Sequence, residues 1–347
     1  MEDKHRPLHI VMTPVRNEAW VLRAFLTATS LWADYIIIAD QMSTDGSRDI
    51  YCEFPKVIVI DNTTPNFNEA ERQSMLISKA REVAAGRDTL LWGLDADEIL
   101  TANAFNSNDW QRIINSNPGA VFFFNWAILS HNLTHYYVPP TRFPWCFHDD
   151  KVEPHGNYVR NMHSMRIPYP IDEHDVNYIT EFYVFHLSEV NTYRMESKRR
   201  FYIFIDWEMN NRSSITLARQ YSVLPDTTRK YMPIDKSMLY TQYNFGIDLW
   251  KLLHTEDKQS WMDDYIYDRL QNYNLKDIAK LKIWDIDFLK EKGMHDPRDW
   301  WIKLFHTYLD VSMKYKHCIL IRAIDKLLKM IEQLVRSNIH SDKKNIL

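Results

Sequence analysis

The chain has 347 residues, of which 45% are hydrophobic, 14% aromatic and 25% charged, and its formal net charge is -4. These values fit a globular protein of one large or two ordinary domains. They disfavour a nucleic-acid-binding protein, so we expect no nucleic-acid partner. Three scattered cysteines without a Cys-x-x-Cys pair predict a reducing compartment. No apolar signal region or membrane-spanning run is evident, and we therefore expect a cytoplasmic protein.

The first hundred residues alternate between short apolar runs and amphipathic segments of helical spacing. Alternation of this kind predicts an α/β fold, with a mostly parallel sheet, right-handed crossovers and flanking helices. Strands are predicted at residues 8–13, 35–39, 57–60 and 90–94, and helices at residues 19–32 and 68–85; further strands are expected at 119–128 and 181–188.

Three of the first four strands are followed or ended by an acid: Asp40, Asp61 and Asp95. Ligands of open parallel sheets bind at the carboxyl ends of the strands, so these acids are expected to line a ligand site. Asp95 and Asp97 are two residues apart and would point to the same side of an extended chain. Such a pair suits a divalent cation, although Asp-x-Asp also occurs in ordinary surface turns. No glycine-rich phosphate loop is present, so a metal is the expected phosphate holder.

Four motifs occur in order: the segment 13–18 (TPVRNE), the segment 32–34 (WAD), the segment 40–47 (DQMSTDGS) and the segment 94–98 (LDADE). Together they resemble the family 2 glycosyltransferases of the GT-A fold, nearest to bacterial enzymes that build lipopolysaccharide and surface polysaccharides. The resemblance covers about residues 8–130 and fades afterwards. It implies inverting transfer of a sugar from a nucleotide-diphosphate sugar to a saccharide or lipid-linked acceptor, with Mg²⁺ or Mn²⁺.

The resemblance also implies roles for individual residues. Asp97 would be the main metal ligand and part of the catalytic centre, Asp95 would contact the metal or the ribose, and His186 would complete the metal site. Asp40 would receive the base or ribose. Each role has a structural alternative, such as turn stabilisation for Asp45 or a hydrogen bond under the strand end for His186. The other nucleotide-binding candidates are Pro14, Arg16, Asn17, Glu18, Ser43, Asp45 and Arg72.

An inverting transferase needs a general base to deprotonate the acceptor hydroxyl. Asp150 is the preferred candidate and His163 the second. The related enzymes carry a His-Glu pair near this point, whereas His163 is followed by Ser164 here. This departure keeps a catalytically degenerate nucleotide-sugar-binding homologue open as an alternative. A sugar nucleotidyltransferase is another, although its glycine- and lysine-rich loop is missing. The remaining candidates for the base are Asp149, Glu153, Asp172 and Glu173.

The C-terminal third changes to helical periodicity, and we expect a catalytic domain over residues 1–234 and a helical extension over residues 235–347. The last predicted helix, about residues 317–336, has an apolar face. Residues 311–347 hold eight Lys or Arg and three Asp or Glu. A basic amphipathic helix fits peripheral contact with an anionic membrane. Packing on its own domain or on a second subunit is the alternative, and the sequence does not give the oligomeric state.

Overall fold

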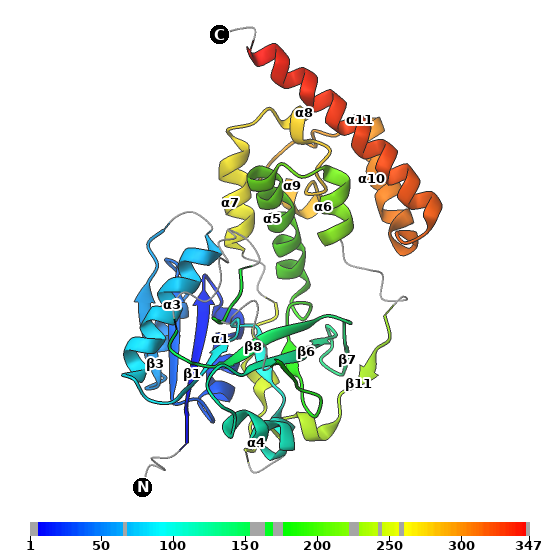
Figure 1. Cartoon of the computed structure of the whole chain (residues 1–347). Coiled ribbons are helices and arrows are strands. Elements are labelled where there is room, and N and C mark those ends of the chain that lie inside the picture. The colour runs from blue at the N-terminus through cyan, green and yellow to red at the C-terminus, as the bar shows by residue number, and fades with distance from the viewer. Residues whose placement is uncertain are drawn as a thin grey trace. The chain divides into compact units, whose positions relative to one another are not determined.

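A computed structural model describes residues 6–64, 68–152, 164–168, 176–221, 229–241, 245–256 and 260–344, with side chains as far as residue 333 (Figure 1). The chain divides into two compact units. Unit 1 combines Met1–Thr192 with Tyr231–Asp257, and unit 2 combines Tyr193–Lys230 with Lys258–Leu347. This division differs from the single boundary expected at residue 234, because each unit is made from two separate stretches of chain.

In the described residues of unit 1, eleven strands form one sheet with the order β11-β7-β6-β8-β4-β1-β2-β3, while β5, β9 and β10 pair outside this path. The strands β1 to β4 pair in parallel, as the alternating pattern predicts. The α/β architecture is confirmed, and antiparallel pairing of β8 with β4 and β6 makes the sheet mixed. The strands are β1 (Leu8–Val15), β2 (Tyr35–Asp40), β3 (Val57–Asp61), β4 (Thr89–Gly93), β5 (Glu98–Leu100), β6 (Val121–Leu129), β7 (His135–Tyr137), β8 (Arg142–His148), β9 (Val176–Tyr178), β10 (Val184–His186) and β11 (Met232–Pro233).

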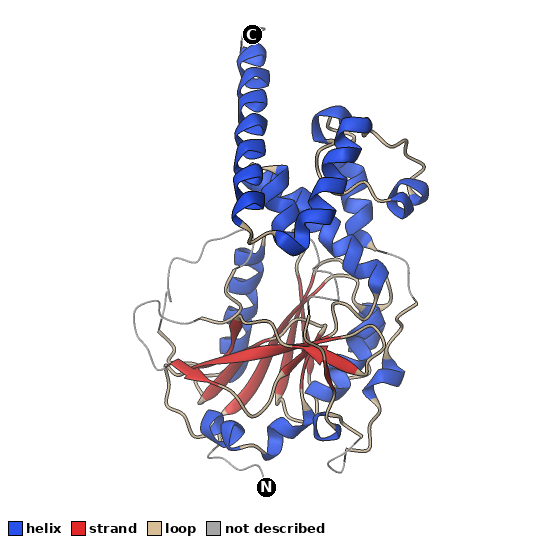
Figure 2. Ribbon diagram, turned by 90° about the vertical axis from the view of Figure 1, so that its right-hand side faces the viewer, coloured by secondary structure: helices blue, strands red, loops and turns tan. Residues whose placement is uncertain are grey.

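Helices cover both faces of this sheet. Figure 2 shows the helices in blue on either side of the strands in red. On β1, Val11 faces one hydrophobic core, whereas Ile10 and Met12 face a second core that includes Leu76 of α3. Strands buried on both faces read as continuous apolar runs, which explains why the sequence marks them clearly. The helices of unit 1 are α1 (Ala19–Thr29), α2 (Ser47–Tyr51), α3 (Glu69–Ala84) and α4 (Asn108–Ile114), with 3₁₀ turns η1 (Ala102–Asn106), η3 (Lys236–Met238) and η4 (Leu249–Leu252).

The segment Tyr231–Asp257 belongs to unit 1 because it supplies part of its core. Tyr240 and Leu249 are buried in the larger hydrophobic cluster. The Tyr240 hydroxyl donates to the Leu100 carbonyl at 3.0 Å, and the His254 amide donates to the Trp20 carbonyl at 2.8 Å. These contacts are the physical reason why the chain returns to unit 1 after residue 230.

Unit 2 is helical in its described residues. A buried ion pair joins its two stretches of chain, with Arg200 Nη2 2.8 Å from Asp263 Oδ2. No helix in the described part of the chain is long and apolar enough to cross a membrane. The helices are α5 (Thr192–Asn210), α6 (Ser214–Tyr221), α7 (Trp261–Leu270), α8 (Leu275–Ile278), α9 (Ile286–Glu291), α10 (Trp300–Ser312) and α11 (Ile319–Lys344), with the 3₁₀ turn η5 (Met313–Tyr315).

Candidate functional site

The predicted site residues gather at the carboxyl edge of the parallel strands. Val15, at the end of β1, is paired with Asp40 of β2, and Asp40 is paired with Asp61 of β3. Asp95 and Asp97 follow directly after β4, which pairs with the other side of β1. Neighbouring strands lie about 4.8 Å apart, so β2 and β4 are about 10 Å apart. The loops after β1, β2 and β4 therefore share one edge of the sheet.

The acids after β4 are bound by an arginine from a distant part of the sequence. Arg166 Nη2 lies 2.5 Å from Asp95 Oδ2, and Arg166 Nη1 donates to Glu98 Oε2. The Glu98 side chain is completely buried. Burial raises the pKa of Glu98, and the Arg166 guanidinium partly offsets that rise. Despite its own desolvation, the pKa of Arg166 is raised by the Asp95 and Glu98 carboxylates, so the guanidinium stays charged.

Gly93, the last residue of β4, permits the close approach of Arg166. A Cβ atom at this position would lie 2.6 Å from Arg166 Cβ and 2.8 Å from the Arg166 carbonyl oxygen. Both distances are shorter than van der Waals contact, so any larger side chain would displace the backbone that carries the guanidinium. Ser164 connects the segment that carries Arg166 to α3, because the Ser164 amide donates to Glu69 Oε2 at 2.9 Å.

Asp97 lies beside His186, as the predicted site requires. The distance from His186 Nε2 to Asp97 Oδ2 is 3.5 Å, and both side chains are largely buried. The β10 strand brings them together, because His186 is paired with Glu98 in the antiparallel ladder of β10 and β5. The Trp126 ring stacks on the imidazole at 4.5 Å, and its indole N–H donates to Glu98 Oε1 at 2.9 Å. The imidazole is thus fixed between an aromatic ring and a carboxylate.

Asp40 is buried and already bound by its own chain. Its Oδ1 accepts from the Ser43 amide at 3.1 Å and from Arg48 at 2.7 Å, while Oδ2 accepts from the Tyr51 hydroxyl at 2.7 Å. Burial together with the Asp40 carboxylate raises the pKa of Tyr51, which keeps this hydroxyl protonated. The carboxylate organises the loop after β2 and retains acceptor capacity for one further donor on Oδ2.

The loops after β1 and β2 are joined by hydrogen bonds. The Asn17 amide donates to Ser43 Oγ at 3.0 Å, and the Glu18 amide donates to Ser47 Oγ at 3.1 Å. Asp45 accepts from the Ala19 amide at 2.9 Å, so it caps the start of α1 from a different loop. Asp45 also stabilises its own turn, the structural alternative that the sequence leaves open, because its Oδ1 accepts from the Ser47 amide at 3.0 Å. The half-buried residues Pro14 and Arg16 lie in the same β1 exit region.

Neither protein-family models nor curated proteins give a match to this chain.

Arg72 lies in the first turn of α3, at the same edge as Asp40, and is half-buried. Asp150 is elsewhere. Its neighbour Asp149 donates its amide to the Thr89 carbonyl at the amino end of β4, and β8 runs antiparallel to β4.

Asp150 therefore lies at the opposite edge from Asp95 and Asp97, and its assignment as general base is not retained. His163, Glu153, Asp172 and Glu173 lie outside the described residues. Asp149 is also excluded as a base at the site, because it lies at the same edge as Asp150. Its buried carboxylate is paired with Arg81, with Oδ1 2.8 Å from Arg81 Nη2.

The residue that sequence reasoning missed is Arg166. It is 71 residues from Asp95 and 68 from Glu98, so no local spacing links them. The available signal is the acid cluster itself, since Glu98 is too buried to remain charged without a cation. Among the described residues, no group of three or more His, Cys, Asp or Glu side chains is arranged to hold a metal ion.

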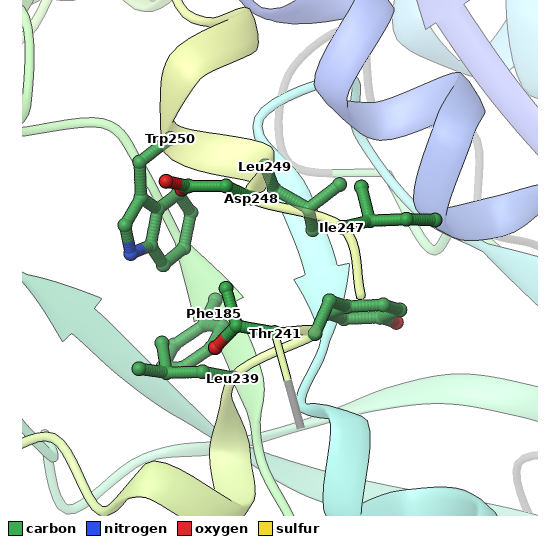
Figure 3. Close-up of a pocket in the computed structure, with 8 residues that line it drawn as sticks. Phe185, Leu239, Thr241, Ile247, Asp248, Leu249 and Trp250 are labelled. Atoms are coloured by element: carbon green, nitrogen blue, oxygen red, sulfur yellow. The ribbon is translucent and has the colours of Figure 1, made fainter. Parts of the chain in front are cut away.

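A separate cavity of about 200 Å³ adjoins Phe185 of β10 (Figure 3). Successive strand residues face opposite ways, so Phe185 lines this cavity while His186 faces Asp97. The ring centroids of Trp250 and Phe185 are 5.7 Å apart, and Asp248 is the one carboxylate among the described lining residues. The cavity is therefore not part of the acid site. Its lining is Phe185, Leu239, Tyr240, Thr241, Ile247, Asp248, Leu249 and Trp250.

Proposed function

We propose that the chain is an inverting glycosyltransferase of the GT-A type. It would move a sugar from a nucleotide-diphosphate sugar to a saccharide or lipid-linked acceptor in polysaccharide or lipopolysaccharide synthesis. The main support is the placement of Asp95 and Asp97 after β4, on the same sheet edge as the joined loops after β1 and β2. A nucleoside diphosphate can extend along this edge, with its base or ribose near Asp40 and its phosphates near Asp97.

Asp97 and His186 are the residues that would hold Mg²⁺ or Mn²⁺. Two protein ligands suffice for such an ion when substrate phosphates and water supply the others. The ion would compensate the negative charge that develops on the leaving diphosphate. Arg166 supports this assignment indirectly: by neutralising Asp95 and Glu98 it allows three acids to lie together, and Asp97 remains beside the imidazole.

A second candidate is a nucleotide-sugar-binding homologue without turnover. The observation that favours it is the Arg166 guanidinium, which binds two of the three acids after β4. Because Asp95 is bound by this guanidinium, it is not available as a second carboxylate ligand of a metal ion. The two candidates differ in whether bound donor sugar is released by transfer or hydrolysis.

The test is a thermal-shift screen of nucleoside diphosphates with and without Mn²⁺, followed by measurement of nucleoside diphosphate release from the matching nucleotide sugar. We expect a metal-dependent rise in Tm with one nucleotide and slow donor hydrolysis. Asp97→Ala should remove the metal-dependent part of the rise, whereas Asp150→Ala, an acid at the opposite edge, should keep it. A rise without hydrolysis would favour the binding protein, and no rise with any nucleotide would exclude both candidates.

A further inference from the structure

Two acids of α11, the last helix of unit 2, are buried against the rest of that unit. Asp325 accepts from Arg219 Nε at 2.9 Å and from the Tyr308 hydroxyl at 2.8 Å. Glu332, two turns later, accepts from the backbone amide of Ser214 at 3.1 Å. The two carboxylates are only 7% and 6% exposed. Residues seven apart lie on one face of a helix, so these acids fix which side of α11 faces the rest of unit 2.

The opposite side of α11 is apolar and exposed. Five of its side chains are 49–85% exposed, far more than apolar side chains on a helix packed into a core. They recur at the spacing of a single helix face. Figure 2 shows α11 as a long helix whose later turns extend past the other helices of unit 2. We name this surface the α11 outer face; it consists of Ile319, Leu320, Leu327, Met330 and Ile331.

On α11 itself, every described charged side chain that is not buried is positive. Between residues 313 and 333 the sequence has five Lys or Arg and two acids, and both acids are the inward Asp325 and Glu332. Arg322 and Lys326 are exposed on α11. The preceding helix α10 exposes two stacked indole rings, Trp300 and Trp301, with centroids 3.8 Å apart. Exposed tryptophan, lysine and arginine side chains are typical of proteins that bind a lipid interface.

We propose that the α11 outer face docks on an anionic lipid surface. An apolar stripe of this kind inserts at the boundary of headgroups and acyl chains, while the adjacent cations bind anionic headgroups. A second copy of the chain is the less suitable partner. A symmetric pair would bring two basic surfaces together, without an exposed acid on α11 to neutralise them in the described residues. This inference does not depend on the proposed catalytic activity, because it concerns unit 2 alone.

Vesicle co-sedimentation of the full chain tests the proposal. The vesicles are phosphatidylcholine alone and phosphatidylcholine mixed with phosphatidylglycerol. We expect binding to the mixed vesicles that weakens as salt is added. Leu320→Ser combined with Leu327→Ser should weaken it at least tenfold, since each leucine loses apolar area that the lipid would cover. Arg322→Gln combined with Lys326→Gln should weaken it about fivefold for each cation.

Matched controls use exposed residues of unit 2 on other helices. Ile286→Ser in α9 removes an exposed apolar side chain, and Lys276→Gln with Lys290→Gln removes two exposed cations. Both controls should bind as the unchanged chain does. No binding to the mixed vesicles would overturn the proposal, and so would equal loss in the controls. Self-association in sedimentation velocity that Leu320→Ser and Leu327→Ser abolish would assign the α11 outer face to a second copy instead.

Discussion

A buried carboxylate needs a compensating charge, and for Glu98 that charge is the guanidinium of Arg166. The same arginine binds Asp95, so one side chain holds two of the three acids after β4. The sequence places these acids correctly at a strand end and predicts that a positive group binds there. It cannot identify Arg166 as that group, because the contact is made by folding and not by local spacing. Asp40 differs in this respect, since its partners Arg48 and Tyr51 follow it by only 8 and 11 residues, in the α2 segment.

Arg166→Gln should lower the free energy of unfolding by about 3 kcal/mol, because it leaves the buried Glu98 carboxylate without its cation. Adding Glu98→Gln should recover part of the loss, since no buried charge then remains unpaired. Chemical denaturation of the single and double variants measures the coupling. The matched control is Arg23→Gln, which breaks an ion pair with Glu53 at the surface and should cost under about 1 kcal/mol. If Arg166→Gln and Arg23→Gln lowered the free energy of unfolding equally, this role for Arg166 would be refuted.

His9→Phe should remove a pH-dependent loss of stability. Burial lowers the pKa of His9 from 6.5 to about 4, so the unfolded chain binds the proton more readily than the folded chain. Stability is therefore complete above about pH 6.5 and falls as pH drops towards about 4. Near pH 5 the loss is about 2 kcal/mol. Phenylalanine should fit among the rings of Trp32, Trp92 and Trp110 that surround the imidazole.

The measurement is the difference in unfolding free energy between the His9→Phe variant and the unchanged chain, at neutral pH and near pH 5. Differences cancel the contributions of other titrating groups that are far from His9. The variant should gain relative stability on acidification. His295→Gln changes an exposed histidine and should show no such gain. An unchanged difference for His9→Phe would mean that this imidazole is not kept neutral by burial.

At the scale of elements, the strands and helices before residue 100 follow from periodicity, because each buries a defined apolar pattern. The predicted strand at residues 181–188 is shorter in the structure, where β10 comprises Val184–His186. The orientation of α11 could not be predicted. Its apolar residues spread over more than one face, and Ile321, Ile324 and Leu328 lie towards the unit while Leu320 and Leu327 are exposed. Arg219 and Ser214, each more than a hundred residues away, decide between these faces through Asp325 and Glu332.

At the scale of the whole molecule, the chain leaves unit 1 at residue 192 and returns at residue 231. A change in composition along the sequence marks the start of helical periodicity but not this return. The core positions of Tyr240 and Leu249 depend on contacts with segments over a hundred residues earlier, such as the bond from Tyr240 to Leu100. Domain boundaries read from periodicity therefore fail where a unit is assembled from two stretches.

This architecture predicts how unit 1 can be isolated. A chain in which a short Gly/Ser linker joins Met1–Thr192 to Tyr231–Asp257 should fold alone, because it keeps every described core residue of unit 1. The same chain ended at residue 234 lacks the buried Tyr240 and Leu249 and the partly buried Trp250. Each of the two buried side chains contributes about 3 kcal/mol, and their sum of about 6 kcal/mol is comparable to the whole stability of a marginally stable domain.

We therefore expect a cooperative thermal transition for the longer chain and none for the shorter one, followed by circular dichroism. Tyr240→Phe in the longer chain is the control for partial loss. It removes the hydroxyl bound to Leu100 but keeps the ring, and it should cost about 1 kcal/mol. If the shorter chain melts cooperatively at the same temperature as the longer one, the returning segment is not part of the core, and a boundary near residue 234 becomes the better description. If neither chain folds, unit 1 needs unit 2 for its stability.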